Sequence, residues 1–160
     1  MKLYHGSTCP IERPATAKGR ASTDFGQGFY TTTHLEQAKK WALSKAGTDK
    51  GAQAFVTTYE ADDDLLNKEE YHTKCFASPD EEWLRFVVNC RKEAGHSYDI
   101  VMGPVANDRI YTTITLYESA ILSAEETVAR LRVNDYFNQV SFHSEAAIKE
   151  LRLITTNKYP

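Results

Sequence analysis

The 160-residue sequence has few cysteines, and their spacing does not match the usual metal-binding or redox motifs. Cys9, Cys75 and Cys90 are an odd number of thiols, which argues against a framework of disulfide bonds. The spacings C-x-x-C and H-x-x-x-H are absent, so we expect no structural zinc and no other bound metal. The cysteines are therefore interpreted as reduced thiols.

Long apolar runs are also missing. No stretch approaches the roughly 18 apolar residues that a membrane-spanning helix requires. The first residues, MKLYH, are not followed by the apolar core of a secretory signal. We therefore expect a cytoplasmic protein without membrane association, or one delivered into a target cell by a route that needs no cleaved signal.

A strong charge of one sign is lacking too. The 19 basic and 22 acidic residues leave a net charge of −3, unlike the basic excess of proteins that bind nucleic acid mainly through its phosphates. A nucleic-acid substrate stays open, because a local basic patch is compatible with this total. The length and the 41% apolar content predict a single domain over residues 1–160.

The hydrophobic pattern predicts an α+β fold, because short strands and amphipathic helices alternate irregularly along the chain. No repeats, linkers or low-complexity stretches interrupt it. We expect strands at 1–6, 29–32, 54–59, 98–105, 139–142 and 152–156, and helices at 35–44, from 78 to about 94, 108–121, 124–132 and 144–151.

Capping residues mark the predicted helix starts. Ser78 with Glu81 three residues later has the pattern of a capping box, in which each side chain bonds a backbone N–H. We also expect Thr33, Ser123 and Ser144 to cap the helices that follow them.

Polar residues gather at three predicted strand ends, in His5-Gly6-Ser7, Gly28-Phe29-Tyr30 and Asn138-Gln139. The preceding Gly26-Gln27-Gly28 begins like a dinucleotide-binding fingerprint. It has no third glycine and leads into a strand instead of a helix, which excludes that motif.

Two of these segments, LYHGS at 3–7 and GFYTT at 28–32, resemble the first two motifs of the histidine–tyrosine–glutamate class of ADP-ribosyltransferases. NQVSF at 138–142 stands where that class has its third motif, with Gln139 in place of the usual catalytic glutamate. The resemblance implies a split β-sheet core with flanking helices. It also implies an NAD⁺-dependent mono-ADP-ribosyltransferase from a bacterial toxin-like branch, with a protein or nucleic-acid acceptor and an antitoxin protein as partner.

The resemblance assigns roles to individual residues. The catalytic residues would be His5, Tyr30 and Gln139: His5 would bond ribose hydroxyls of NAD⁺, and Tyr30 would stack on the nicotinamide. Gly6 would hold the carboxamide through its backbone, where the missing side chain permits close approach. The full NAD⁺-binding set would be His5, Gly6, Ser7, Gly28, Tyr30, Trp41, Asn107 and Arg109.

Gln139 departs from the family in charge. A carboxylate at this position would stabilise the positive charge that develops on the ribose, whereas a glutamine only accepts a hydrogen bond. Losing about 1–2 kcal/mol in this way would slow the step about tenfold or more. Asp24, Glu118 and Glu145 are alternative acids. Gln139→Glu is expected to raise NAD⁺ cleavage if position 139 is the family's third catalytic one, and a neutral or negative result would point to another residue.

Asn107 and Arg109 lie between a predicted strand and a predicted helix. Arg109 suits bidentate contact with a pyrophosphate, because its guanidinium is a planar fork. A helix cap at Asn107 and a surface ion pair at Arg109 are the simpler interpretations of the same residues.

Two other functions fit the same sequence. An NAD⁺ glycohydrolase would use water as acceptor, and a non-catalytic module would bind NAD⁺ or an ADP-ribose-like ligand without cleaving it. The missing glutamate favours the second of these alternatives.

Overall fold

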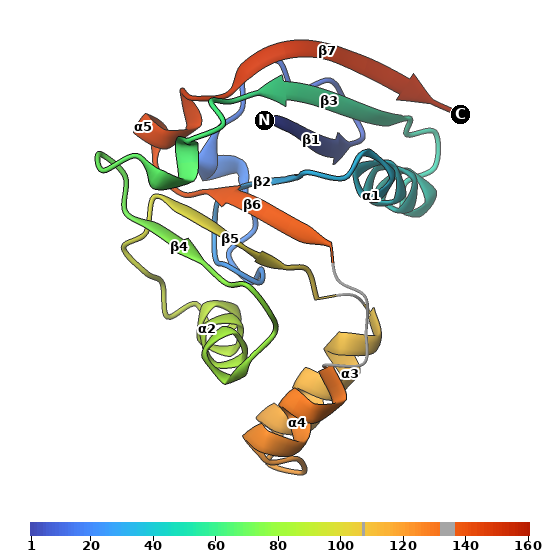
Figure 1. Cartoon of the computed structure of the whole chain (residues 1–160). Helices are drawn as coiled ribbons and strands as arrows, with labels where there is room; N and C mark the ends of the chain where they lie inside the picture. Colours follow the sequence, from blue (N-terminus) through green and yellow to red (C-terminus); the bar gives the residue numbers. More distant parts are fainter. Residues whose placement is uncertain (107, 132–136) are drawn as a thin grey trace.

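A mixed β-sheet crosses the computed structural model of the chain, and helices flank it (Figure 1). The structure describes residues 1–106, 108–131 and 137–160. The α+β fold class is confirmed. The strands are β1 (Lys2–Ser7), β2 (Phe29–Thr32), β3 (Ala54–Glu60), β4 (Thr73–Cys75), β5 (Ile100–Pro104), β6 (Asn138–Phe142) and β7 (Arg152–Tyr159). The helices are α1 (Leu35–Thr48), α2 (Glu81–Arg91), α3 (Asp108–Glu118), α4 (Ala124–Leu131) and α5 (Glu145–Ile148), with 3₁₀ turns at Thr16–Lys18 and Leu65–Asn67.

The strands lie in the order β4-β5-β6-β2-β1-β3-β7, and all neighbours are antiparallel except β4 and β5. β1 pairs along its whole length with β3, from Lys2 opposite Glu60 to Ser7 opposite Phe55. With β2, in contrast, β1 shares the single register pair Tyr4 and Thr32. The sheet is therefore joined least where β1 and β2 meet, at its centre.

The two faces of the sheet carry different cores, because successive side chains of a strand point to opposite faces. One face holds a cluster that includes Leu3, Phe29 and Phe142. The other face is covered by α1 over β1, β2 and β3, and by the group α2, α3 and α4 beside it (Figure 1). Phe25 and Trp83 are central to the cluster around α2, α3 and α4.

Helix α1 lies very close to β1, and Gly6 makes this approach possible. Ala38 and Ala42 are fully buried on the helix face that meets the strand. A Cβ atom added at Gly6 would lie 2.1 Å from the carbonyl oxygen of Ala38. The absence of a side chain is therefore a packing requirement at this position.

Two predicted helix caps are wrong, and two are confirmed. α2 begins at Glu81 after Asp80, whose carboxylate accepts the Trp83 N–H at 2.9 Å, so the cap is not Ser78. Asp80 takes the cap position in place of Ser78 because an ionised carboxylate accepts a stronger hydrogen bond from a backbone N–H than a neutral hydroxyl does. α1 starts after His34 without a side-chain cap, not at Thr33. The Ser123 and Ser144 hydroxyls each accept an N–H of the following helix.

The other differences concern ends and short elements. α1 continues to Thr48, four residues beyond its predicted end at residue 44. β4 was not predicted, because three residues are too few to show a period; it is defined by parallel pairing with β5. The remaining predicted elements are present within a few residues of their expected ends.

Gly6→Ala tests the contact between α1 and β1. We expect it to lower the free energy of unfolding by about 2 kcal/mol or more, because its Cβ would meet rigid helix backbone. Gly47→Ala is the matched control: it lies in α1 with open space around it and should gain about 0.5–1 kcal/mol from helix propensity. Urea unfolding measures both. Equal stabilities of the Gly6 variant and the native protein would contradict the close approach.

Candidate functional site

The three segments singled out in the sequence lie on neighbouring strands at the centre of the sheet, in the order β6-β2-β1. Tyr30 of β2 is opposite Ser141 of β6, and Thr32 is opposite Gln139. Residues more than a hundred positions apart in the chain are thereby aligned in one ladder.

The side chains nevertheless point to different faces. The His5 ring stacks on Phe29 at 4.4 Å between centroids, on the face that carries Leu3. Tyr30 contacts the cluster on the opposite face, where Gln139 also lies. The His5 ring meets β2 through a backbone contact, at 2.6 Å between its Nδ1 and the Tyr30 carbonyl oxygen. The structure therefore brings Tyr30 and Gln139 to one face and places the imidazole on the other.

The hydrogen bond of His5 determines which ring nitrogen carries the proton. A carbonyl oxygen only accepts, so Nδ1–H is the donor to Tyr30. Burial, with a smaller contribution from the ammonium of Lys45, lowers the pKa of His5 to about 4 against the opposing effect of the Tyr30 hydrogen bond, so the ring is neutral at pH 7. Nε2 is then a bare acceptor, and no hydrogen bond of the described residues engages it.

Tyr30 uses its hydroxyl to hold the glycine turn that precedes β2. The oxygen accepts the Phe25 N–H at 3.0 Å and donates to the Gly26 carbonyl at 2.6 Å. The Thr23 hydroxyl lies 2.9 Å away as a further partner. Burial raises the pKa of the phenol, which keeps it protonated as the donor. In this structure Tyr30 therefore positions the residues around Asp24.

The buried carboxylate of Asp24 lies directly against Gln139. Oδ2 accepts the Gln139 Nε2–H at 3.1 Å and the Ala106 backbone N–H at 3.1 Å. The Arg91 Nε lies 3.6 Å from Oδ1. Burial raises the pKa of Asp24, and the hydrogen bonds and Arg91 oppose this rise. Asp24 is 5% exposed and Gln139 4%, so the pair is removed from bulk water.

Of the three acids considered from the sequence, Asp24 is the one that meets Gln139. Glu145 instead accepts the Thr16 hydroxyl at 2.7 Å, and Glu118 is exposed at the C-terminal end of α3. Proximity in the fold thus separates candidates that the sequence left equivalent.

The remaining predicted binding residues have internal contacts. The Gly6 carbonyl accepts a hydrogen bond from the Lys45 ammonium at 3.0 Å. The buried Ser7 hydroxyl donates a hydrogen bond to the Cys9 carbonyl at 2.6 Å. A Cβ at Gly28 would lie 2.6 Å from the Phe142 carbonyl oxygen, so this glycine lets the turn approach β6.

The last three of the predicted binding residues are Trp41, Asn107 and Arg109. Trp41 is half-buried on α1, and no ring contact joins it to Tyr30 in the described part of the chain. Asn107 lies outside the described residues, and so does the side chain of Arg109.

Lys45 is a residue near the site that the sequence interpretation missed. A signal for it exists in the helical spacing. Ala38 and Ala42 form the face of α1 that contacts β1, and position 45 continues that face by one turn. A lysine there reaches the end of β1.

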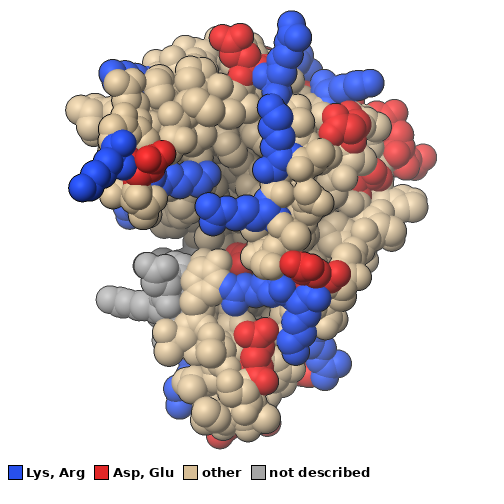
Figure 2. Space-filling model, turned by 180° about the vertical axis from the view of Figure 1, so that it is seen from behind, with Lys and Arg blue, Asp and Glu red and all other residues tan. Residues whose placement is uncertain are grey.

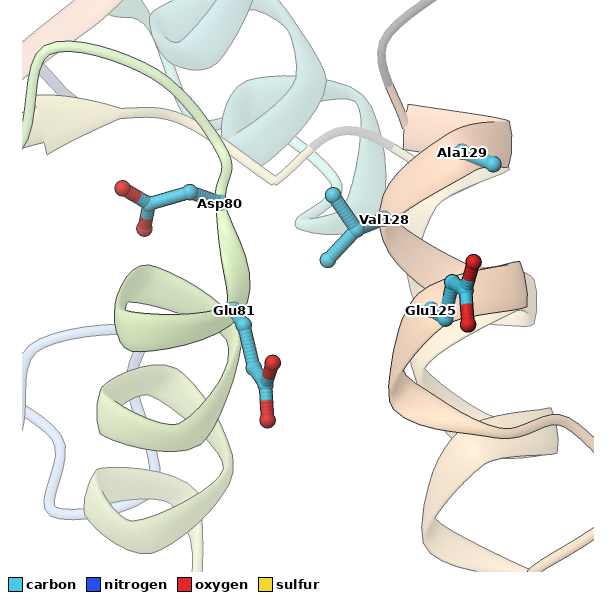
Figure 3. Close-up of a pocket in the computed structure, with 5 residues that line it drawn as sticks. All are labelled: Asp80, Glu81, Glu125, Val128 and Ala129. Atoms are coloured by element: carbon cyan, nitrogen blue, oxygen red, sulfur yellow. The ribbon is translucent and has the colours of Figure 1, made fainter.

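A pocket of about 550 Å³ lies elsewhere, between the start of α2 and α4 (Figure 3). Its lining residues include Glu125 and Val128, and none is a predicted site residue. Asp80 caps α2 and Glu81 pairs with Arg85, so two of its carboxylates are already engaged. Within residues 1–106, 108–131 and 137–160, no group of three or more His, Cys, Asp or Glu side chains is arranged to hold a metal. The helices of these residues are too short or too polar to cross a membrane.

Residues 1–153 match the model of a protein family described as "Protein of unknown function (DUF3990)". No curated protein and no solved structure matches the chain.

The histidine pKa values predict how stability depends on pH. Burial lowers the pKa of His5 and of His143 to about 4 from 6.5, so the unfolded chain binds more protons between these values. The free energy of unfolding should therefore rise with pH from about 4 to 6.5, by a few kcal/mol in total. Urea unfolding across this range measures the slope. His143→Gln should flatten it, and an equally steep slope in that variant would refute the assignment.

Proposed function

The chain belongs to the DUF3990 family, and we propose that it is an NAD⁺-dependent mono-ADP-ribosyltransferase, a bacterial toxin or effector that modifies a macromolecule. The bond between nicotinamide and ribose breaks, nicotinamide leaves with the bonding electron pair, and the ADP-ribosyl group passes to a nucleophile of the acceptor, which loses a proton. This chemistry needs negative charge near the ribose as positive charge develops there.

The contact between Asp24 and Gln139 carries the proposal. The resemblance places a carboxylate at position 139, where this chain has an amide. The Asp24 Oδ2 atom accepts a hydrogen bond from the Nε2 atom of that amide at 3.1 Å, on the face of the sheet to which Gln139 points. We assign to Gln139 the hydrogen bond to the substrate and to Asp24 the charge, with Gln139 polarised by the carboxylate behind it.

The arrangement around β1 also supports this function. The single register pair between β1 and β2 is in keeping with the split sheet that the resemblance implies. The neutral His5 has a free acceptor, Nε2, that would suit a ribose hydroxyl, although its ring lies on the sheet face opposite to Gln139. The Gly6 carbonyl already accepts a hydrogen bond from the Lys45 ammonium. A bound carboxamide would therefore have to compete with Lys45 for this acceptor.

One observation favours a non-catalytic binding module as the second candidate. The polar groups of Tyr30 and Asp24 are engaged by the protein itself, in bonds that stabilise the turn before β2. A module of this kind would bind the dinucleotide without releasing nicotinamide.

Nicotinamide release from NAD⁺ by the purified protein, with and without cell lysate, tests the proposal. We expect release that lysate stimulates, since a macromolecular acceptor is required. His5→Ala should lower nicotinamide release at least tenfold, because it removes the imidazole nitrogen that would accept a hydrogen bond from the ribose hydroxyl. His72→Ala changes an exposed histidine and is the control. Release that is unaffected by lysate would identify a glycohydrolase, and binding of NAD⁺ without release would identify the non-catalytic module.

A charge exchange between positions 24 and 139 tests the role of Asp24. Asp24→Asn should lower nicotinamide release about tenfold or more, because it removes the charge while the remaining amide oxygen can still accept the bonds from Gln139 and Ala106. Gln139→Glu alone would put two buried carboxylates about 3 Å apart, which cannot both ionise, so it should destabilise the fold without raising activity. This reverses the expectation from the sequence alone.

The double variant Asp24→Asn/Gln139→Glu restores one charge to the pair and should regain activity above Asp24→Asn. Thermal unfolding of each variant separates loss of activity from loss of fold. Full activity in a folded Asp24→Asn protein would remove Asp24 from the mechanism.

A further inference from the structure

Two histidines hold the glycine turn at residues 24–28 by its backbone carbonyls. His96 lies in the loop between α2 and β5, and its Nε2 is 2.7 Å from the Phe25 carbonyl oxygen. His143 directly follows β6, and its Nδ1 is 2.8 Å from the Gln27 carbonyl oxygen. The turn is therefore held by side chains from two separate parts of the fold.

The hydrogen bonds of each ring determine where its proton lies. A carbonyl oxygen only accepts, so His96 Nε2 and His143 Nδ1 each carry a hydrogen. The other nitrogen of His96, Nδ1, accepts the Tyr98 backbone N–H at 3.0 Å. His143 Nε2 lies 2.8 Å from the Ser141 hydroxyl oxygen, and burial lowers the pKa of His143 to about 4, so this ring is neutral at pH 7. The two histidines therefore hold the turn as opposite tautomers.

The rings contact each other, and the glycines of the turn allow them to approach. The centroids of the His96 and His143 rings are 4.5 Å apart, edge to face. A Cβ atom at Gly28 would lie 2.7 Å from His143 Nδ1, so a side chain there would displace the ring. Gly26 has a φ of +83°, a conformation that glycine adopts readily. The shape of the turn is thus matched to the two hydrogen bonds that it accepts.

Donors without charge suit this turn because it carries Asp24. Charged side chains are plentiful at the surface, where basic and acidic groups are interspersed over the face seen in Figure 2. A lysine or arginine that donated the same bonds to the turn would add positive charge near the Asp24 carboxylate. That charge would offset the negative charge that the proposed reaction uses. A neutral imidazole supplies the hydrogen bond alone.

We propose that His96 and His143 are positioning residues, which hold the glycine turn as neutral donors of opposite tautomer and thereby keep the Asp24 carboxylate against Gln139. Asp24 directly precedes Phe25, whose carbonyl His96 binds, so a displaced turn would move the carboxylate away from the amide. The effect on nicotinamide release rests on the proposed function, whereas the effect on the order of the turn does not.

Asparagine and glutamine substitutions separate the two tautomers, because the asparagine amide lies near the position of Nδ1 and the glutamine amide near that of Nε2. At position 143 the donor is Nδ1, so His143→Asn keeps a donor to the turn and His143→Gln loses it. At position 96 the donor is Nε2, so His96→Gln keeps it and His96→Asn loses it. A role in packing alone would rank the two replacements in the same order at both positions.

Amide hydrogen exchange followed by NMR measures the order of the turn without any ligand. The probes are the backbone N–H groups of Phe25 and Gly26, which are hydrogen-bonded in this structure. We expect them to exchange about tenfold faster in His143→Gln than in His143→Asn, and about tenfold faster in His96→Asn than in His96→Gln, as for the loss of one hydrogen bond. His72→Asn and His72→Gln change an exposed histidine and should exchange like the native protein.

Equal exchange in the asparagine and glutamine variants at both positions would overturn the proposal. Ring nitrogen NMR shifts of the native protein need no substitution, and the same tautomer at His96 and His143 would overturn it too. Nicotinamide release in the four variants should follow the same reversed order, through kcat more than KM, because the displaced carboxylate acts in the reaction step. The reversed order in exchange without any nicotinamide release would keep the positioning role and refute the transferase. Release that is indifferent to all four variants would keep the transferase and refute the positioning role.

Discussion

The buried carboxylate of Asp24 joins segments that are far apart in the sequence. It accepts hydrogen bonds from Gln139 of β6 and from the Ala106 backbone after β5, and it lies beside Arg91 at the end of α2. A charge removed from water is tolerated only when such partners surround it. The turn that carries Asp24, the centre of the sheet and α2 are therefore constrained to one relative position, and the candidate site depends on it.

A second constraint acts at β1, where steric and electrostatic effects meet. Gly6 allows α1 to approach the strand, and this approach brings Lys45 to the strand end. The weak pairing between β1 and β2 leaves the His5 imidazole to bond the Tyr30 carbonyl instead of a regular ladder partner. Close packing on one side and an incomplete ladder on the other thus create the polar end of β1.

Much of the fold was predictable because hydrophobic periodicity is a local property. The strand at 29–32 was located correctly, as was the cap at Ser144. The cap at Ser78 was wrong because Asp80 competes for the same N–H groups, and the local pattern does not rank competing acceptors. β4 was missed because its pairing with β5, and not its own three residues, defines it.

The amino-acid sequence by itself determined the class of the fold, the strands that carry His5, Tyr30 and Gln139, and the presence of an amide where a carboxylate was expected. Only the tertiary structure decided that Asp24 lies against that amide and that His5 and Tyr30 point to opposite faces. The reason is physical: side-chain period and residue type act within a few positions, whereas contacts across the sheet depend on strand order and register.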